Sequence, residues 1–350
     1  MKFVPERLKQ AAIEILKGLH ASEEEALLVA ESLVRADMRG IGTHGVNYLK
    51  ILADRVDAHM VHLPTGLTVV KEDDTTALID GGNGLGQVAV HQAMEMSIQK
   101  ARGAGLGCSL VRNTNNIGFL AFYTLMAAGQ GMIGIVACNA APSMSPWGGT
   151  EPLLGTNPMS IAVPGGFDLP DIVLDMSSSV VARGKIRRAQ RMNENIPLGW
   201  ALDETGIPTT DPSAALKGTL LPIGGPKGYG LALMIDVIAG ILSGSQYGPH
   251  IKTFHQLLGP TGIGVFSMAI DMERFMPLHQ FRQVMQSYIS SVKGTKKVNG
   301  VSRIYLPGEI ELENERQSLA DGIEVDRDVA GSLNELLEKV KSPLRLTEEL

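Results

Sequence analysis

The segment RADMRGIGTHGVNYLK, residues 35–50, decides which class of fold the chain can adopt. Its residues 40–45, GIGTHG, fit the pattern G-x-G-x-x-G, which marks the phosphate-binding turn of the Rossmann dinucleotide fold. In that fold the turn follows a strand and opens a helix. The elements on either side of these glycines therefore decide whether the match has structural meaning.

The glycines of this segment lie between two predicted helices. Ser22 and Glu25 form a capping box, which marks a helix start, and apolar residues then recur at helical spacing up to the glycines. Residues 46–56 again show helical periodicity. A Rossmann turn is therefore not predicted. Two interpretations remain: a glycine helix stop with an incidental histidine, or a turn that presents Thr43 and His44 at a site.

The composition is that of a globular chain without affinity for polyanions. The 350 residues carry a formal net charge of −6, with 44% hydrophobic and 19% charged side chains. No run of Lys or Arg is long enough to indicate a nucleic acid or an anionic membrane as a partner. The longest apolar stretch, residues 230–242, is interrupted by Asp236 and is too short for a membrane span.

Cysteine usage and the start of the chain favour a cytoplasmic location. Cys108 and Cys138 lie in apolar runs, where they are expected to be small buried hydrophobic side chains. No disulfide framework is present, so a reducing compartment is predicted. The first residues, MKFVPERLKQ, lack the apolar segment of a signal peptide.

Helical and strand patterns alternate along the chain, which is typical of an α/β fold. The first 60 residues predict three helices, and later helices are expected at 86–103, 118–131, from about 181, 226–242, 279–294 and twice near the C-terminus. Strands are expected at 67–73, 75–82, 106–113, 132–139, 159–166, 172–179, 263–272 and 302–308. The strands at 159–166 and 172–179 are joined by a short turn, so they predict a hairpin and a mixed sheet.

Lys227 is the strongest physical indication of a binding site. It follows Gly224, Gly225 and Pro226, so it falls in the first turn of the helix expected from residue 226. A cation there opposes the helix dipole, at a cost of roughly a few tenths of a kcal/mol. That cost is explained if the lysine faces an anion that the helix amides also bind. The alternative is a solvated surface lysine.

Two further segments place polar groups at predicted strand ends. LLGTNP, residues 153–158, predicts a turn before a strand. LDMSSSVVARGK, residues 174–185, ends a strand and opens a helix, which is where α/β proteins hold ligands. Each also has a structural explanation, a simple turn in the first case and helix capping by serines in the second. His59 and His62 have no cluster of carboxylates or cysteines near them, so no metal site is predicted.

Taken together, these segments resemble the malate/L-lactate dehydrogenase family, the type that is distinct from the Rossmann lactate and malate enzymes and includes sulfolactate, ureidoglycolate and diketogulonate dehydrogenases or reductases. Eight motifs in the order and at about the spacing of that family carry the resemblance. They are ADMRGIGTHGV, GGNGLGQ, RNTNNIG, GGTEPLLGTNP, LDMSSSVVARGKI, PLGWALDETGIPTTDP, GGPKGYGLALMIDV and LPGEIE. The match covers nearly the whole chain.

The resemblance implies a fold and an assembly. The fold would be the α/β arrangement of that family, a mixed sheet flanked by helices. Residues 1–74 would form a helical lobe together with C-terminal helices at about 310–350. Residues 75–309 would form the region that binds cofactor and substrate, as one lobe or as two interleaved lobes. The protein would be a homodimer whose active site lies near the interface.

The resemblance also implies an activity and its residues. Hydride would pass between NAD or NADP and a 2-hydroxy acid, 2-oxo acid or related carbonyl or imine substrate. His44 would exchange the proton, because a histidine titrates near neutral pH, and Thr43 would orient it. The cofactor-binding residues would be Asn139, Ala140, Thr156, Asp175, Met176, Ser177, Lys227, Gly308 and Glu309. This reading favours the second interpretation of the glycine turn, in which the histidine matters and the glycine pattern is a coincidence.

Two residues that would face the substrate depart from the family pattern. The family usually has Ser-His-Gly-x-x-Arg, and here Tyr48 stands in place of the arginine that would grip a carboxylate with two hydrogen bonds. The family also tends to carry a second histidine where this chain has Asn116, whose amide can bind a carbonyl but cannot donate a proton at neutral pH.

Three consequences of these departures are open. Specificity can change, with Tyr48 supplying a hydroxyl and Lys50, Arg183 or Lys185 recognising the anion. His44 alone can suffice for ordinary 2-hydroxy acids. The chain can also be a cofactor-binding relative with little or no dehydrogenase activity. The intact cofactor motifs argue against the last of these.

Overall fold

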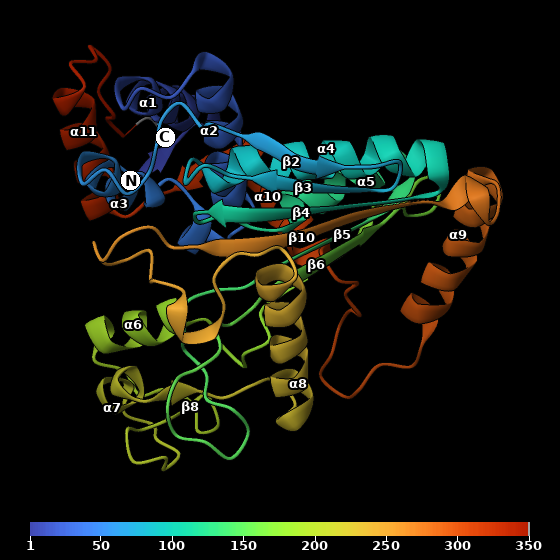
Figure 1. Ribbon diagram of the computed structural model, residues 1–350. Helices are drawn as coiled ribbons and strands as arrows, with labels where there is room; N and C mark the ends of the chain where they lie inside the picture. The colour runs from blue at the N-terminus through green and yellow to red at the C-terminus, as the bar shows by residue number, and fades with distance from the viewer. Residues whose placement is uncertain (349–350) are drawn as a thin grey trace.

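The computed structural model describes residues 1–348, and its centre is a seven-stranded mixed sheet (Figure 1). The strand order is β2-β3-β4-β10-β5-β6-β7, in which β3 and β4 run parallel and the other neighbours run antiparallel. The strands are β2 Thr68–Glu72, β3 Thr76–Asp80, β4 Leu106–Thr114, β5 Met132–Cys138, β6 Met159–Val163, β7 Ile172–Met176 and β10 Ile263–Asp271. The predictions of a mixed α/β sheet and of a hairpin from β6 to β7 are confirmed.

Helices cover both faces of this sheet. α4 (Gly86–Ala104) and α5 (Ala121–Ala128) pack on the upper face in Figure 1, where the two glycines Gly107 and Gly134 let the layers approach closely. A Cβ at Gly107 would lie only 2.0 Å from the Ser97 carbonyl oxygen of α4. α8 (Pro226–Ile235) packs on the opposite face, against Ala137 of β5.

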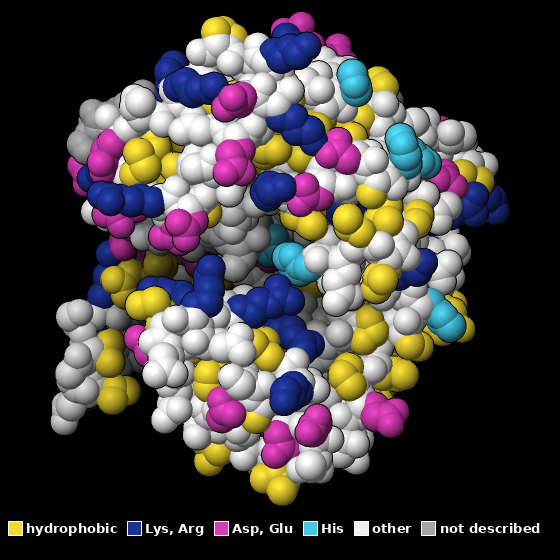
Figure 2. Space-filling model, turned by 90° about the vertical axis from the view of Figure 1, so that its left-hand side faces the viewer, with side chains coloured by type: hydrophobic (Ala, Val, Ile, Leu, Met, Phe, Trp, Pro, Cys, Tyr) yellow, Lys and Arg dark blue, Asp and Glu magenta, His cyan; other side chains and the backbone are white. Residues whose placement is uncertain are grey.

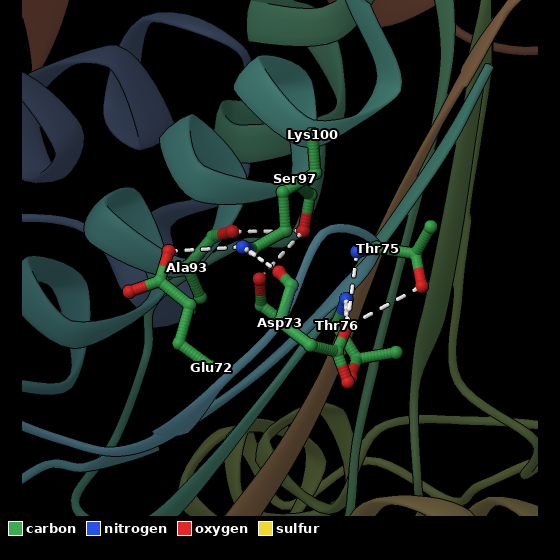
Figure 3. Close-up of polar contacts among 8 residues, drawn as sticks. Glu72, Asp73, Thr75, Thr76, Ala93, Ser97 and Lys100 are labelled. Carbon is green, nitrogen blue, oxygen red and sulfur yellow. Dashed lines mark hydrogen bonds and ion pairs between the residues drawn. The ribbon is translucent and has the colours of Figure 1, made fainter. Parts of the chain in front are cut away.

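The turn between β2 and β3 is fastened to α4 by side chains from both elements (Figure 3). The Asp73 carboxylate accepts hydrogen bonds from the backbone amides of Thr75 at 3.0 Å and Thr76 at 2.8 Å. Lys100 of α4 donates to Glu72 at 2.9 Å and to the Asp73 carbonyl oxygen. The edge of the sheet is therefore held by local polar contacts, although β2 itself is exposed along its whole length.

A helical lobe joins the two ends of the chain. It contains α1 (Pro5–Gly18), α2 (Glu23–Met38), α3 (Tyr48–Asp57) and α11 (Arg327–Lys339), with β1 (Lys2–Phe3) paired to β11 (Ile323–Glu324). The predicted capping box is present, since Ser22 Oγ accepts from the Glu25 amide at 3.2 Å and Glu25 Oε2 accepts from the Ser22 amide at 2.8 Å. Full burial of each large apolar side chain in this core contributes roughly 1.5–3 kcal/mol.

Two smaller groups of elements complete the fold. α6 (Arg183–Met192), α7 (Pro212–Lys217), β8 (Ala201–Leu202) and β9 (Thr219–Leu220) form a unit below the sheet in Figure 1. α9 (Leu278–Gly294) extends from the far end of the sheet, and α10 (Glu309–Asp321) returns to α2, where Glu315 pairs with Arg35 and Arg39.

The structure corrects two predicted elements. No strand forms at 302–308; this segment is mostly exposed and makes one backbone bond to the sheet, from the Val173 amide to the Pro307 carbonyl at 3.0 Å. The helix expected at 226–242 is α-helical only to Ile235 and continues as a π-helix over Asp236–Ile241, where the Asp236 side chain is buried. In addition, β2 belongs to the sheet, so the sheet begins before the expected lobe boundary at residue 74. In residues 1–348 no helix is long and apolar enough to cross a membrane.

Candidate active site

The ends of five strands lie side by side at one end of the sheet, and we call this region the strand edge. The register pairs Thr114 of β4 with Ile263 of β10, and Val265 of β10 with Cys138 of β5. It also pairs Ala137 of β5 with Met159 of β6, which in turn faces Met176 of β7. Most of the expected site residues follow or precede these ends. They are Asn116 after β4, Asn139 and Ala140 after β5, Thr156 before β6, and Asp175, Met176 and Ser177 at the end of β7.

Buried amide side chains lock this edge together. The Asn139 amide donates to Asp236 Oδ1 at 2.9 Å and to the Gln246 carbonyl at 2.8 Å, and its oxygen accepts from the Gly264 amide at 2.8 Å. Asn157 accepts from the Ala140 amide at 2.9 Å and donates to the Ala232 carbonyl of α8 at 2.8 Å. Both side chains are engaged, and so are the backbone amides of residues 139 and 140, which donate to the Gly264 carbonyl at 3.3 Å and to the Asn157 side chain.

The strand ends lead directly to the start of α8. The Thr156 carbonyl accepts from the amide and the hydroxyl of Ser178, at 2.8 and 2.7 Å. The Ile223 amide donates to the Ser178 carbonyl at 2.9 Å, and Gly224 and Gly225 then turn the chain with positive φ into Pro226. Lys227 follows in the first helical turn, exposed and without an ion pair in the described part of the chain. The start of α8 thus offers open backbone amides and a cation.

Asp175 adds a carboxylate to this edge. Its Oδ2 accepts from the Ala121 amide at 2.8 Å. Desolvation raises the pKa of Asp175 to about 6, against the lowering effect of that bond, of the Leu120 amide and of the Arg39 charge. More than a third of its surface remains open to solvent, so the carboxylate is ionised at neutral pH.

The segment Pro307–Glu309 lies beside β7. A Cβ at Gly308, whose φ is +84°, would lie 2.8 Å from Val173 Cβ, so glycine is required there. Burial opposes ionisation of Glu309, but hydrogen bonds from Lys293, the Leu306 amide and Arg303 outweigh it and lower its pKa to about 2. The carboxylate is therefore occupied by its own chain, and the backbone at Gly308 packs against Val173 near the start of β7.

The glycine turn forms a short 3-10 helix, Gly42–His44, between α2 and α3. Asp37 of α2 supports it: Oδ2 accepts from the Val46 amide at 2.8 Å, and a Cβ at Gly45 would overlap this carboxylate. The turn lies against the start of α6, because a Cβ at Gly184 would be only 3.2 Å from Thr43 Cγ2. Figure 2 shows a hollow between the helical lobe and α6, with histidine at its centre and Lys and Arg side chains along its lower margin.

His44 is half-buried in this turn. Desolvation, followed by the nearby charge of His255, lowers its pKa to about 4. The ring is thus neutral at pH 7, which is the state that accepts a proton. Within residues 1–348 neither the ring nor the Thr43 hydroxyl forms a side-chain hydrogen bond. Thr43 turns its methyl group toward Gly184, so the expected tautomer-fixing bond from Thr43 is not formed.

Asn116 has a defined orientation. Its Oδ1 accepts from the Gly118 amide at 2.9 Å. Because the Gly118 amide donates this bond, the side-chain atom that it faces must be the oxygen of Asn116. The other terminal atom of the side chain is therefore Nδ2. The Nδ2 group is left as a hydrogen-bond donor on the strand edge, a role that suits a carbonyl or carbinol oxygen.

Tyr48 does not line the hollow as expected. Its side chain is 6% exposed and stacks on Phe254, with ring centroids 4.8 Å apart. Burial raises the pKa of its hydroxyl far above the ordinary value. As the first residue of α3, it belongs to the helical core and packs the loop that carries Phe254.

The two cations proposed for the substrate differ in their environment. Arg183 is half-buried and donates to the Leu216 carbonyl of α7, so its guanidinium joins two elements of the fold. Lys185 is exposed and has no ion pair in the structure as described. No group of three or more His, Cys, Asp or Glu side chains among residues 1–348 is arranged to hold a metal ion.

Comparisons with known proteins agree with this geometry. The family described as malate/L-lactate dehydrogenase matches residues 3–334. Malate dehydrogenase of Pyrococcus horikoshii is 38% identical over 343 residues, which cover 96% of this chain and 94% of that protein. The chain belongs to the malate/L-lactate dehydrogenase family. Ureidoglycolate dehydrogenase (NAD(+)) of Escherichia coli K12 is 33% identical, with 94% of both chains covered. The solved sulfolactate dehydrogenase of Methanocaldococcus jannaschii superposes with a TM-score of 0.93 at 37% identity, covering 98% of both chains.

Membership of the malate/L-lactate dehydrogenase family places the chain among NAD(P)-dependent dehydrogenases. The strand edge fits such a cofactor. The amides at the start of α8, the exposed Lys227 and the absence of a side chain at Gly224 together make a surface that suits a diphosphate. Asp175 and the backbone of residues 139–140 border the same surface.

Several residues that support or border the candidate site were not predicted from the sequence. Asn157 was visible in the GTNP motif, but its double hydrogen bond across to α8 depends on tertiary contacts. Asp37 lies within the first quoted segment and its support of the turn has no local signal. His255 interacts electrostatically with His44, and Arg187 with His255, because a loop and a helix far apart in sequence meet there.

Proposed function

We propose that the chain oxidises a 2-hydroxy acid to a 2-oxo acid, or the reverse, with His44 as the proton-exchanging residue. The observation that carries the proposal is the contact of the Thr43–His44 turn with Gly184, next to the strand edge that suits the cofactor. Carbonyl and imine substrates related to 2-oxo acids fit the same arrangement. The relatives' names, malate and ureidoglycolate dehydrogenase among them, support hydroxy acids first.

The protonation state of His44 supports the role of a base. With a pKa lowered to about 4, the ring is neutral at pH 7 and can take the hydroxyl proton as the alcohol is oxidised. An anionic substrate next to the ring raises that pKa, because an opposite charge favours the imidazolium. During alcohol oxidation the bound anion therefore favours transfer of the hydroxyl proton to His44. In the reverse direction it keeps His44 protonated, so that the proton is available to the substrate oxygen.

Asn116 supports the same oxygen from a second side. Its Nδ2 donor is free, and a donor aimed at an oxygen that gains negative charge stabilises the transition state. This is an electrostatic role, which differs from that of the second histidine of the family. A nicotinamide bound at the strand edge supplies the hydride chemistry.

The cofactor would be NAD or NADP, held by the backbone at Asn139, Ala140, Thr156 and Gly308, by Asp175, Met176 and Ser177, and by Lys227 at the start of α8. Glu309 contributes by fixing the Gly308 turn through Lys293 and Arg303. We also propose a homodimer and a cytoplasmic location. Support for the dimer comes from the projecting α9, which exposes Val284 and Tyr288 beside a shallow hollow of about 480 Å³.

The buried Tyr48 and the amide at position 116 favour a second candidate, a cofactor-binding relative with little or no dehydrogenase activity. Both changes remove groups that act directly on the substrate in the family pattern. The free His44 and the free Asn116 donor support the dehydrogenase over this alternative.

The test is a kinetic and binding experiment on the purified protein. NADH and NADPH absorbance is followed at neutral pH with 2-oxo acids, uncharged ketones and cyclic imines, while fluorescence titration measures the affinity for each cofactor. Turnover of a 2-oxo acid is the expected result. Micromolar cofactor binding without turnover of any compound would favour the silent relative, and no cofactor binding would contradict both candidates.

A further inference from the structure

The motif GGNGLGQ, residues 81–87, has no part in the site described above. Its last two residues begin α4, and the first turn of this helix lies directly against the loop that carries Asn116. A Cβ at Gly86 would be 2.4 Å from the Asn116 carbonyl oxygen and 2.6 Å from that of Asn115. Glycine is therefore required at the start of the helix, because the loop rests on its backbone.

The loop is held on either side of Asn116. Asn115 Nδ2 donates to two carbonyl oxygens of the motif, at 2.8 and 3.0 Å. The hydroxyl of the buried Tyr123 donates to the Ile117 carbonyl. The Gly118 amide donates to Asn116 Oδ1 at 2.9 Å. The direction in which Asn116 Nδ2 points therefore depends on where the backbone of Gly118 lies.

Two buried polar side chains approach Gly118 and have no hydrogen-bond partner among residues 1–348. They are Ser32 of α2 and Gln87 of α4, and each is 0% exposed. A Cβ at Gly118, whose φ is +72°, would be 3.3 Å from Ser32 Oγ and 3.8 Å from Gln87 Nε2. The hydroxyl and the amide therefore border the same small space, beside a residue that has no side chain.

The chemistry of these two side chains indicates what fits between them. Buried polar groups in folded proteins almost always have a partner, either a protein group or an ordered water molecule. A leucine in place of Gln87 would have a similar size and no desolvation cost, so the amide is expected to have a partner. Water suits this place because it both donates and accepts, and it binds where several polar groups converge.

We propose that Ser32 and Gln87 hold an ordered water molecule against Gly118, and that this water positions Asn116 for the reacting oxygen. The proposal rests on the proposed function, in which Asn116 Nδ2 donates to that oxygen. Gln87 is a positioning residue, since it is buried and does not touch the substrate. The water fixes the Gly118 backbone, and the Gly118 amide fixes the side chain of Asn116. Small displacements matter here, because a donor stabilises the transition state only when it is aligned.

The kinetic test is a double-mutant cycle between Gln87 and Asn116. Gln87→Leu should lower kcat by about 10-fold and change KM by less than about 2-fold. In an Asn116→Ala background the same substitution should change kcat by less than about 2-fold, because the group that it positions is absent. Gln99→Leu, at an exposed position of α4, is the matched control. Equal losses in both backgrounds, or no loss in either, would overturn the proposal.

Urea denaturation separates positioning from a general structural role. Gln87→Leu should leave the midpoint of unfolding unchanged or raise it, because it removes a buried polar group together with the water that satisfies it. A lower midpoint would show that Gln87 supports the whole fold, and it would overturn the positioning role.

A crystal structure separates failure of the water site from failure of the proposed function. In the wild type we expect an ordered water within about 3.2 Å of Ser32 Oγ and of the Gln87 amide. In Gln87→Leu this water should be lost, and Asn116 should no longer have a single orientation. That result supports the site even if no compound is turned over, in which case the proposed dehydrogenase activity alone fails. Direct bonds from Gln87 to protein groups, with no water between them, would overturn the proposal.

Discussion

The strand edge and the hollow between His44 and α6 are built in opposite ways. At the strand edge, the polar side-chain atoms of Asn139, Asn157 and Ser178 bond mainly to backbone groups of other segments, and the surface left for a ligand is made of amides and glycines. In the hollow, His44 and Arg187 have free polar ends and few partners. The strand edge is therefore suited to one fixed ligand. In the hollow, a single substitution can change which substrate binds without disturbing the fold.

The largest effect is expected from removal of the Asn139 side chain, the central amide of the strand edge. Asn139→Ala leaves Asp236, the Gln246 carbonyl and the Gly264 amide with lost partners in a buried place. We expect the free energy of unfolding to fall by about 3 kcal/mol or more, because unpaired buried polar groups retain their desolvation cost. Urea denaturation measures it. The exposed Asn195→Ala is the control, and a loss below about 1 kcal/mol for Asn139→Ala would contradict the account.

Removal of His44 should affect the hollow alone. His44→Ala is expected to lower turnover by roughly 100-fold or more, because the proton then has no positioned acceptor. Cofactor affinity and the free energy of unfolding should remain near wild type. Steady-state kinetics and cofactor fluorescence measure the two effects. His279→Ala, at an exposed position of α9, is the matched control, and unchanged turnover in His44→Ala would end the assignment.

A substitution at Asn116 can remove the Nδ2 donor and keep the hydrogen bond that Oδ1 accepts from the Gly118 amide. Asn116→Asp keeps an oxygen for the Gly118 amide but replaces Nδ2 with a second oxygen. We expect kcat to fall by about 100-fold, as for the loss of one donor to a developing oxyanion. Asn116→His, which restores a donor, should retain more activity than the aspartate variant. Equal activity in wild type and Asn116→Asp would show that the amide does not contact the reacting oxygen.

Lys227 tests whether the strand edge binds an anion. Lys227→Gln should weaken NADH or NADPH binding by about 10-fold while kcat at saturating cofactor changes little. The free energy of unfolding should stay the same or rise by a few tenths of a kcal/mol, roughly, because a cation at a helix start is unfavourable. Lys296→Gln serves as the control. If cofactor affinity is unaffected, the lysine is a solvated surface residue, the simpler explanation of its position.

The smallest effect concerns pH. The folded-state pKa of His44 is lowered to about 4 from 6.5, so kcat/KM for alcohol oxidation should hold as pH falls below 6.5 and decline only toward 4. Because the folded protein binds this proton more weakly than the unfolded chain does, the free energy of unfolding should be unaffected above pH 6.5 and should fall as pH drops toward 4. His255→Gln removes a neighbouring positive charge, so it should raise the pKa of His44 and move the acid limb of the kcat/KM profile to higher pH. A limb centred at 6.5 in the wild type would show that burial does not perturb the ring.

Much of the fold was predictable because its signals are local. The capping box at Ser22, the periodicity of α4 and the hairpin from β6 to β7 all follow from neighbouring residues. The strand expected at 302–308 was wrong because the segment is mostly exposed and forms only one backbone hydrogen bond to β7, so it does not pair as a strand. The strand order was also beyond prediction, since the insertion of β10 between β4 and β5 is a long-range pairing.

The candidate site also combines residues that local sequence patterns indicate with residues that only long-range contacts bring to the site. The residues of the strand edge were predicted from motifs, because backbone turns with glycine and proline leave recognisable patterns. In the hollow, two residues predicted to bind substrate have contacts within the fold: Tyr48 is buried and Arg183 donates to the Leu216 carbonyl of α7. Arg187 and His255 had no motif at all. Side chains with free ends leave no trace in the local sequence, so only the tertiary structure brings them together.

The position of β10 also determines when the protein can become active during synthesis. Asn116 and Asn139 follow strands that touch each other only through β10, which is encoded more than a hundred residues later. Until that strand has left the ribosome, the two halves of the sheet have no common edge. A nascent chain therefore cannot bring Asn116 to the same strand edge as Asn139, and the onset of turnover should report that the central strand is in place.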